Sequence, residues 1–235
     1  MTNSTAQQKL LEQITDDILC GNFKPRERLV ESDLMEKYGA TRNAVRNAFK
    51  ELQALKLVIH QLNCGVAVAE VTEKDAMNLY KVRVLLESYA AHQVMVNLTD
   101  PLLEELKSLH KKFIDSVDGH DFRTMSRSNV NFHERIYQIS QNQVIKDLIR
   151  DLRTRSNLLL YQIWRNSGQL DTSMRDHEGL LAALKRRDIE AFIRINSKHI
   201  LASLQHYLGK TIAEMGFENL VSRSFNTKDL IEILA

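Results

Sequence analysis

Gly39 stands between two stretches of helical periodicity, and this break constrains the fold of the first part of the chain more than any other feature. Before it, large apolar residues occupy positions 30, 34, 35 and 38. After it, Thr41 can cap a second helix, whose apolar residues fall at positions 44, 45, 48, 49, 52 and 55. Because glycine readily adopts the left-handed conformation that ends a helix, the pattern predicts two helices joined by a tight turn.

The second of these predicted helices carries a basic, hydrogen-bonding face. Arg42 and Arg46 are four residues apart and clear of the apolar positions, beside the amides of Asn43 and Asn47. Arginine can bind guanine through two hydrogen bonds, and asparagine can bind adenine in the same way. Residues 41–56 carry four basic side chains and a single acidic one. This pattern is typical of a helix that enters the major groove of DNA.

Two short β-prone runs follow the second helix. They span residues 57–60 and 65–69. The turn-forming residues 62–65 lie between the two runs and overlap the start of the second. Apolar runs of this length around such a turn predict a β-hairpin. Helices joined by a tight turn and followed by a hairpin indicate a winged helix-turn-helix domain.

Composition excludes several other classes of protein. The 235 residues are 43% hydrophobic and contain few glycines and prolines, which favours a mostly helical chain with a sizeable core. The net charge is only +2, so affinity for DNA must depend on local placement of charge. Cys20 and Cys64 have neither zinc-finger spacing nor a disulfide framework, and no apolar run approaches the ~18 residues of a membrane span. We therefore expect a cytoplasmic protein without a membrane partner.

Beyond residue 72 almost the whole sequence has a helical period, and helices are expected near 73–97, 100–117, 121–140, 142–166, 169–186 and 188–208. The predicted fold is mainly α, with a winged helix-turn-helix domain over residues 1–71 and an all-helical bundle of six to seven helices over residues 72–235. The tail 207–235 is expected to add one or two helices through its apolar residues, namely Leu220, Val221, Phe225, Leu230, Ile231, Ile233 and Leu234.

The first domain resembles the GntR family of transcriptional regulators. The matching residues are Ile18 to Pro25, Arg28-Leu29, Tyr38 to Arg42, Val45 to Phe49, Leu52 and Cys64 to Val68. The resemblance implies that Arg28, Thr41, Arg42, Asn43 and Arg46 contact DNA and that Gly65 lies at the tip of the wing. Together with the geometry of DNA recognition, it also implies a homodimer on a double-stranded operator with palindromic half-sites. The chain departs from the family at Arg26, usually glycine, at Asn47, usually glutamate, and at Cys64, usually a basic residue of the wing.

The second domain resembles the FCD effector domain of the FadR branch of that family. The resemblance rests on Tyr80 to Glu87, Asn129 to Ile136, Gln141-Asn142, Asp176 to Leu184, Arg187 to Ala191 and His199. It implies a small carboxylate effector, which Arg83 would hold by its planar guanidinium. An internal ion pair between Arg83 and Glu87, four residues on, is an equally open interpretation.

By the same resemblance, a divalent metal would be bound by His133, His177 and His199 together with Asn129, which stands where the family has aspartate. The spacing of Asn129 and His133 places both on one helical face. Three imidazoles and an amide form a neutral set of ligands that suits zinc, nickel or a similar ion. The alternative is that these histidines pack in the bundle without a metal.

A metal-dependent hydrolase is a competing hypothesis. His133-Glu134 and His177-Glu178 begin like zinc-hydrolase motifs, but Tyr137 and Leu181 occupy the position of the second histidine. A non-DNA-binding interaction adaptor is a further alternative, which leaves the two arginines of the basic helix unexplained. The sequence thus predicts a DNA-binding transcriptional regulator, more often a repressor in this family, controlled by a small carboxylate.

Overall fold

The computed structural model describes residues 3–61, 65–164 and 169–217. Contacts divide the chain into two compact units, one made of residues 1–72 and 154–161 and the other of residues 73–153 and 162–235. Within the described ranges, no helix is both long enough and apolar enough to cross a membrane.

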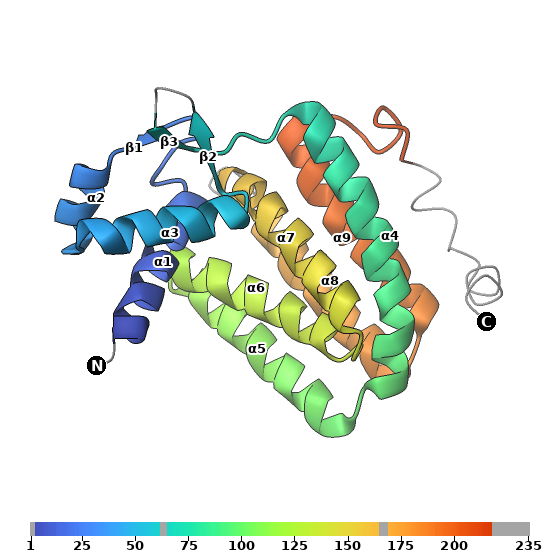
Figure 1. Ribbon diagram of the computed structural model, residues 1–235. Helices are drawn as coiled ribbons and strands as arrows, with labels where there is room; N and C mark the ends of the chain where they lie inside the picture. The colour runs from blue at the N-terminus through green and yellow to red at the C-terminus, as the bar shows by residue number, and fades with distance from the viewer. Residues whose placement is uncertain (1–2, 62–64, 165–168, 218–235) are drawn as a thin grey trace. The chain divides into compact units, whose positions relative to one another are not determined.

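Three helices build the first unit around one apolar core (Figure 1). They are α1 (Asn3–Leu19), α2 (Glu31–Tyr38) and α3 (Arg42–Ala54), and α1 and α2 both pack against α3. The inward-facing residues predicted for α3 are buried or half-buried. The buried core residues are Leu10, Ile14, Ile18, Leu29, Leu34, Val45, Ala48, Phe49, Leu52, Leu57, Val58 and Val68.

The tight turn between α2 and α3 has the predicted chemistry. Gly39 ends α2 with a φ of 61°, and its N–H donates to the carbonyl of Met35. Thr41 begins α3, because its hydroxyl accepts a hydrogen bond of 3.3 Å from the backbone N–H of Ala44. The helix-turn-helix prediction is therefore confirmed, down to the residues that end one helix and start the next.

A three-stranded antiparallel sheet completes the first unit. Its strands are β1 (Arg28–Leu29), β2 (Val58–Gln61) and β3 (Gly65–Val68), in the order β1-β3-β2. The predicted hairpin is β2 and β3, with Val58 opposite Val68 and Gln61 opposite Gly65. Strand β1 was not predicted, because two residues are too few to display an alternating pattern. Cys64 lies outside the described residues.

Arg26 occupies a backbone conformation that explains the usual glycine at this place. Its φ is 67°, in the left-handed region that costs a residue with a Cβ about 1–2 kcal/mol. The side chain bonds to Glu70 with a distance of 2.7 Å from Nε, but this pair is exposed and so offsets little of the strain. The departure at Arg26 is thus tolerated at a cost.

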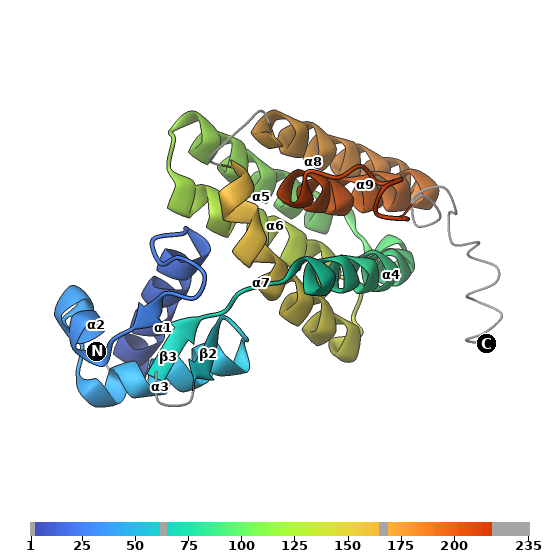
Figure 2. The same cartoon turned by 90° about the horizontal axis from the view of Figure 1, so that it is seen from above.

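The second unit is a bundle of helices (Figure 2). In the part of the chain that the structure describes, these are α4 (Glu73–Asn97), α5 (Asp100–Asp118), α6 (Phe122–Gln138), α7 (Gln143–Trp164), α8 (Gln169–Arg186) and α9 (Ile189–Leu208), and residues 154–161 of α7 belong to the first unit. Helix α4 packs against α9 and α6, and α8 packs against α9 and α5. The helices begin within one residue of the predicted positions, and Asp121 caps α6 and Asp188 caps α9 through hydrogen bonds from backbone N–H groups. A continuous apolar core joins these helices.

The tail begins with turns, and the extra helices expected within it stay a prediction. Helix α9 ends at Leu208, and residues 209–217 form turns. The turn is closed by Thr211 and Glu214, which hydrogen-bond to each other's backbone N–H. Phe217 is fully buried, with the ammonium of Lys81 on α4 5.0 Å from its ring centroid. The apolar tail residues from Leu220 onward lie outside the described residues.

Candidate DNA interface and histidine cluster

Helix α3 presents its polar face to solvent as predicted. The side chains of Arg42 and Arg46 are 62% and 58% exposed, and Asn43 and Asn47 are exposed beside them. The opposite face of the helix is buried in the core. A helix held by one apolar face is rigidly placed, so the polar face is available to a groove of DNA.

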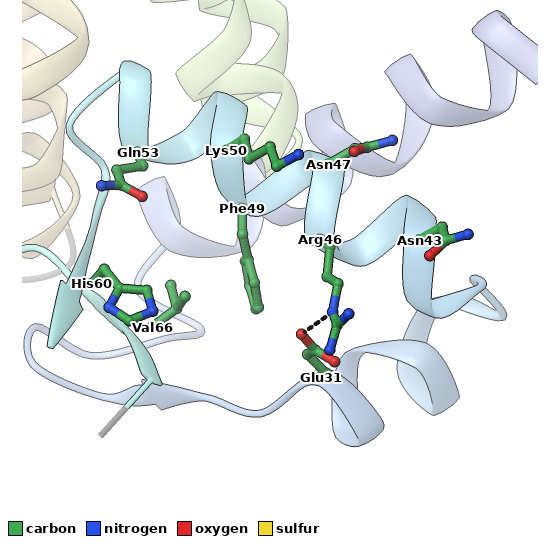
Figure 3. Close-up of a pocket in the computed structure, with 9 residues that line it drawn as sticks. All are labelled: Glu31, Asn43, Arg46, Asn47, Phe49, Lys50, Gln53, His60 and Val66. Carbon is green, nitrogen blue, oxygen red and sulfur yellow. Dashed lines mark hydrogen bonds and ion pairs between the residues drawn. The ribbon is translucent and has the colours of Figure 1, made fainter. Parts of the chain in front are cut away.

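A hollow of about 670 Å³ lies along this exposed face (Figure 3). Its floor contains Phe49, and its wall opposite α3 contains His60 of β2 and Val66 of β3. Helix α3 contributes polar side chains along the length of the hollow, namely Asn43, Arg46, Asn47, Lys50 and Gln53. The hollow therefore has hydrogen-bond donors on both sides and an apolar floor, which suits contact with a nucleic acid.

Glu31, the first residue of α2, closes one end of the hollow. Its carboxylate accepts a hydrogen bond of 2.7 Å from Nε of Arg46, and its other oxygen lies 3.6 Å from Nε of Arg42. This hydrogen bond, together with the negative charge of Glu31, raises the pKa of Arg46. Both predicted base-contacting arginines therefore share one acidic neighbour from the preceding helix.

The structure also brings together the two predicted contacts outside α3. Gly65 opens β3 with a φ of 84°, and the guanidinium of Arg28 lies just beyond it, since a Cβ at Gly65 would be 3.9 Å from Nε of Arg28. The guanidinium of Arg28 thus lies at the end of the hairpin next to the turn, where Gln61 pairs with Gly65. Thr41 has a structural task as well, because its hydroxyl caps α3.

The three predicted metal ligands of the second unit converge on one point. Nε2 of His133 is 3.1 Å from Nε2 of His177 and 3.2 Å from Nε2 of His199. These side chains come from α6, α8 and α9, and the first two are fully buried. Nitrogen atoms held about 2.0–2.1 Å from a tetrahedral ion are about 3.3–3.4 Å apart. The triad is therefore close to the spacing that a zinc-like ion requires.

Two further observations bear on whether these residues fit a metal. Nδ1 of His199 donates to a carboxylate oxygen of Asp176 at 3.1 Å, so its Nε2 keeps a lone pair directed at the centre. The side-chain oxygen of Asn129 is buried, and no hydrogen-bond partner for it exists among the described residues. An amide oxygen of this kind can serve as a ligand, so the set of donors fits a borderline divalent ion.

Protonation of the two buried histidines is strongly disfavoured. Burial, followed by the nearby charge of Arg153, holds the pKa of His133 well below its ordinary value. Burial, followed by electrostatic repulsion from the neighbouring His199, does the same to the pKa of His177. Neutral imidazoles are the form that binds metals, so the triad is ready for a cation near neutral pH.

Arg83 lies in a buried cluster of charges near this triad. Its Nε donates to Glu87 at 2.9 Å, which is the ion pair that sequence reasoning held open. Arg153 of α7 also donates to Glu87, at 3.1 Å and 3.3 Å, and the amide of Asn196 is 3.4 Å away. The guanidinium of Arg83 lies over the ring of Tyr80, 5.2 Å from its centroid. Two buried guanidiniums therefore face one carboxylate.

The fold and the exposed basic helix define a DNA-binding winged-helix protein with a helical second unit. Comparison with known families identifies the class more closely. Residues 6–68 match the bacterial regulatory proteins of the gntR family, and residues 78–202 match the FCD domain. The chain belongs to the GntR family of transcriptional regulators, in the branch with an FCD domain. It is a DNA-binding regulator, and the hydrolase hypothesis is set aside because this family consists of regulators rather than enzymes.

Individual relatives cover most of the chain. The transcriptional regulator YdhC of Bacillus subtilis is 27% identical over 88% of this chain and 92% of its own length. The gluconate operon transcriptional repressor of the same organism is 26% identical over 73% of this chain and 72% of its own length. The solved structure of McbR from Escherichia coli superposes with a TM-score of 0.76, at 22% identity, over 89% of this chain and 99% of that one. The likeness to the McbR structure supports the fold of this chain.

Sequence reasoning missed three side chains at these sites. The sequence does not single out Glu31, because nothing local links it to Arg46, 15 residues later. Arg153 meets Glu87 across 66 residues, and Asp176 meets His199 across 23. For Asp176 a signal existed, since it directly precedes His177 in the matched motif.

Proposed function

We propose that this regulator represses transcription as a homodimer bound to a palindromic operator, and that a small carboxylate releases it. The observation that carries the proposal is the exposed polar face of α3, which belongs to a matched family of DNA-binding regulators. Repression is supported by the gluconate operon repressor among its relatives. Residues 1–71 form the DNA-binding domain and residues 72–235 the effector and dimerisation domain. Such a protein works in the cytoplasm, where it meets the chromosome.

In this proposal α3 lies in the major groove of each half-site. Arg42, Asn43, Arg46 and Asn47 meet the base edges. Arg28 and the tip of the wing at Gly65 meet the sugar-phosphate backbone. Lys50 and His60, at the other end of the hollow, add phosphate contacts that the sequence alone did not predict. A single head has too few base contacts for tight specific binding, so paired half-sites are required.

The effector is a small carboxylate, and Arg83 is its anchor with Arg153 beside it. Both guanidiniums are buried, and both contribute positive charge at His133. Gluconate, after which one relative's operon is named, belongs to the same chemical class. An arriving carboxylate would replace or share the contacts that Glu87 makes, because a planar guanidinium can hold a carboxylate by two hydrogen bonds.

A divalent metal is held by His133, His177, His199 and the side-chain oxygen of Asn129. Support comes from the 3.1 Å and 3.2 Å separations of the imidazole nitrogens and from the position of Asp176 behind His199. Zinc or nickel suits these neutral nitrogen donors better than magnesium, which prefers oxygen ligands.

The test of DNA recognition is selection of duplexes from a random pool by the purified full-length protein. We expect one palindromic sequence to be enriched, and its retardation in a gel to require two protein chains per duplex. Recovery of no preferred sequence would favour the interaction adaptor instead. A thermal-shift screen of carboxylates, each with and without added zinc or nickel, then tests the effector and metal sites together.

A further inference from the structure

Glu31 is the single acidic side chain among the nine described residues that line the hollow along α3. Negative charge at a DNA interface opposes binding, since phosphates repel a carboxylate. The position of Glu31 is therefore unfavourable for the affinity of the protein for DNA. Figure 3 shows the carboxylate of Glu31 directed at the guanidinium of Arg46 rather than away from the hollow.

The two ion pairs of Glu31 have a common geometry. In both, the closest guanidinium atom is Nε, at 2.7 Å for Arg46 and 3.6 Å for Arg42. The Nε side of a guanidinium is the inner edge of its fork, and the two terminal Nη groups form the outer end. A carboxylate that holds Nε thus leaves the outer end for the paired acceptors of a guanine or for a phosphate.

Stability does not explain why this contact exists. Glu31 is 31% exposed and the two arginines are more than half exposed, so each pair adds little to the stability of the fold. Val30 at the N-cap of α2 makes no side-chain cap hydrogen bond, and the side chain of Glu31 extends to α3. What the contact does accomplish is restraint of a long, flexible arginine side chain before DNA arrives.

We propose that Glu31 is a positioning residue that sets the sequence specificity of this regulator, by holding Arg46, and less closely Arg42, for contact with bases. The proposal rests on the DNA recognition proposed above. Without Glu31, the guanidinium of Arg46 is free to turn toward the nearest phosphate, which every DNA sequence offers. Binding then becomes less selective, and the loss of one negative charge strengthens binding to any sequence.

The experiment compares two duplexes of equal length: one selected from a random pool by the wild-type protein, and one of scrambled sequence. Dissociation constants are measured over a series of salt concentrations for the full-length wild type, Glu31→Gln and the control Glu36→Gln. Glu36 is an exposed residue of the same helix, so its replacement removes the same charge without touching Arg46.

We expect Glu31→Gln to bind the scrambled duplex more tightly and to lose roughly tenfold in its preference for the selected duplex, which is within the range for one base contact. Glu36→Gln should keep the wild-type preference. Equal tightening of both duplexes by Glu31→Gln would overturn the proposal, because Glu31 would then act only as a repelling charge. An unchanged preference with unchanged affinities would overturn it too, since the ion pair would then be a surface contact.

A double variant tests whether Glu31 acts through Arg46. Lysine has no Nε fork for Glu31 to hold, so Arg46→Lys and the double variant Glu31→Gln/Arg46→Lys should show the same preference. If the losses of preference caused by the two substitutions add, Glu31 makes a contact of its own and does not act through Arg46. Failure of the underlying DNA proposal looks different, because the wild-type protein would then enrich no sequence in the selection.

Discussion

Acid should destabilise the metal-free protein through the buried histidines of the triad. Burial, aided by nearby positive charge, keeps the pKa of His133 and of His177 far below the ordinary value of about 6.5. The unfolded chain binds protons at these residues below pH ~6.5, whereas the folded chain does not. Because the unfolded state binds more protons, the free energy of unfolding must fall as the pH falls through this range.

The size of the effect follows from the number of such groups. Each histidine contributes about 1.4 kcal/mol per pH unit once the pH is well below its unfolded value. The pair together therefore removes up to about 4 kcal/mol between pH 6.5 and 5, a large share of the 5–15 kcal/mol that is usual for a folded domain. Above pH ~7 the stabilising contribution of these two histidines is fully present, so the free energy of unfolding should no longer change with pH on their account.

Urea unfolding followed by circular dichroism, with a chelator present and at pH values from 7.5 to 5, measures this slope. The variant His133→Gln lacks one of the strongly shifted groups, so its slope should be shallower than that of the wild type. Burial also lowers the pKa of His92 and of His110, but these residues remain in both proteins. His206→Gln is the matched control, because His206 is exposed on α9 and its loss should leave the slope unchanged. A wild-type slope no steeper than that of His133→Gln would refute the reasoning for His133, since this imidazole would then not resist protonation in the folded protein.

Four shorter predictions concern the other sites. Arg46→Ala should weaken operator binding by roughly 5- to 150-fold, the ~1–3 kcal/mol of a bidentate base contact, while thermal melting stays near wild type; an unaffected gel shift would exclude the contact. Arg83→Lys should keep DNA binding but lose most of the response to the effector, as measured by release of the operator. Asn129→Asp should tighten zinc binding in calorimetry, because an anionic oxygen joins the shell; weaker binding would remove this residue from the site. Phe217→Ala should cost about 3–5 kcal/mol of stability, and a negligible loss would show that the turn at 209–217 packs loosely in solution.

The first unit was predictable because its signals are local. Gly39 and Thr41 each act on backbone within four residues, and the inward face of α3 repeats with the helical period. The hairpin likewise depends on neighbours in sequence. Strand β1 escaped prediction because only its pairing with β3, some 40 residues away, makes it a strand.

The histidine cluster was predictable only in part, and the resemblance to a family carried it. Periodicity places Asn129 and His133 on one face, but nothing in the spacing brings His177 and His199 to them from two other helices. The bundle does that, because α6 packs against α4 and α5, which pack in turn against α9 and α8. Asp176 and Arg153 depend on the same packing, so their roles emerged only when the helices were assembled.

The charges at the centre of the second unit favour an anion over a cation. Arg83 and Arg153 are buried there with Glu87, and their positive charge is felt at His133. With Asn129 in place of an aspartate, the triad offers neutral donors alone. A metal bound here would be held by its coordination bonds and not by opposite charge, and it would itself attract a carboxylate. An effector that contacts both Arg83 and the metal would then bind more tightly when the metal is present, and by linkage would tighten the metal in return.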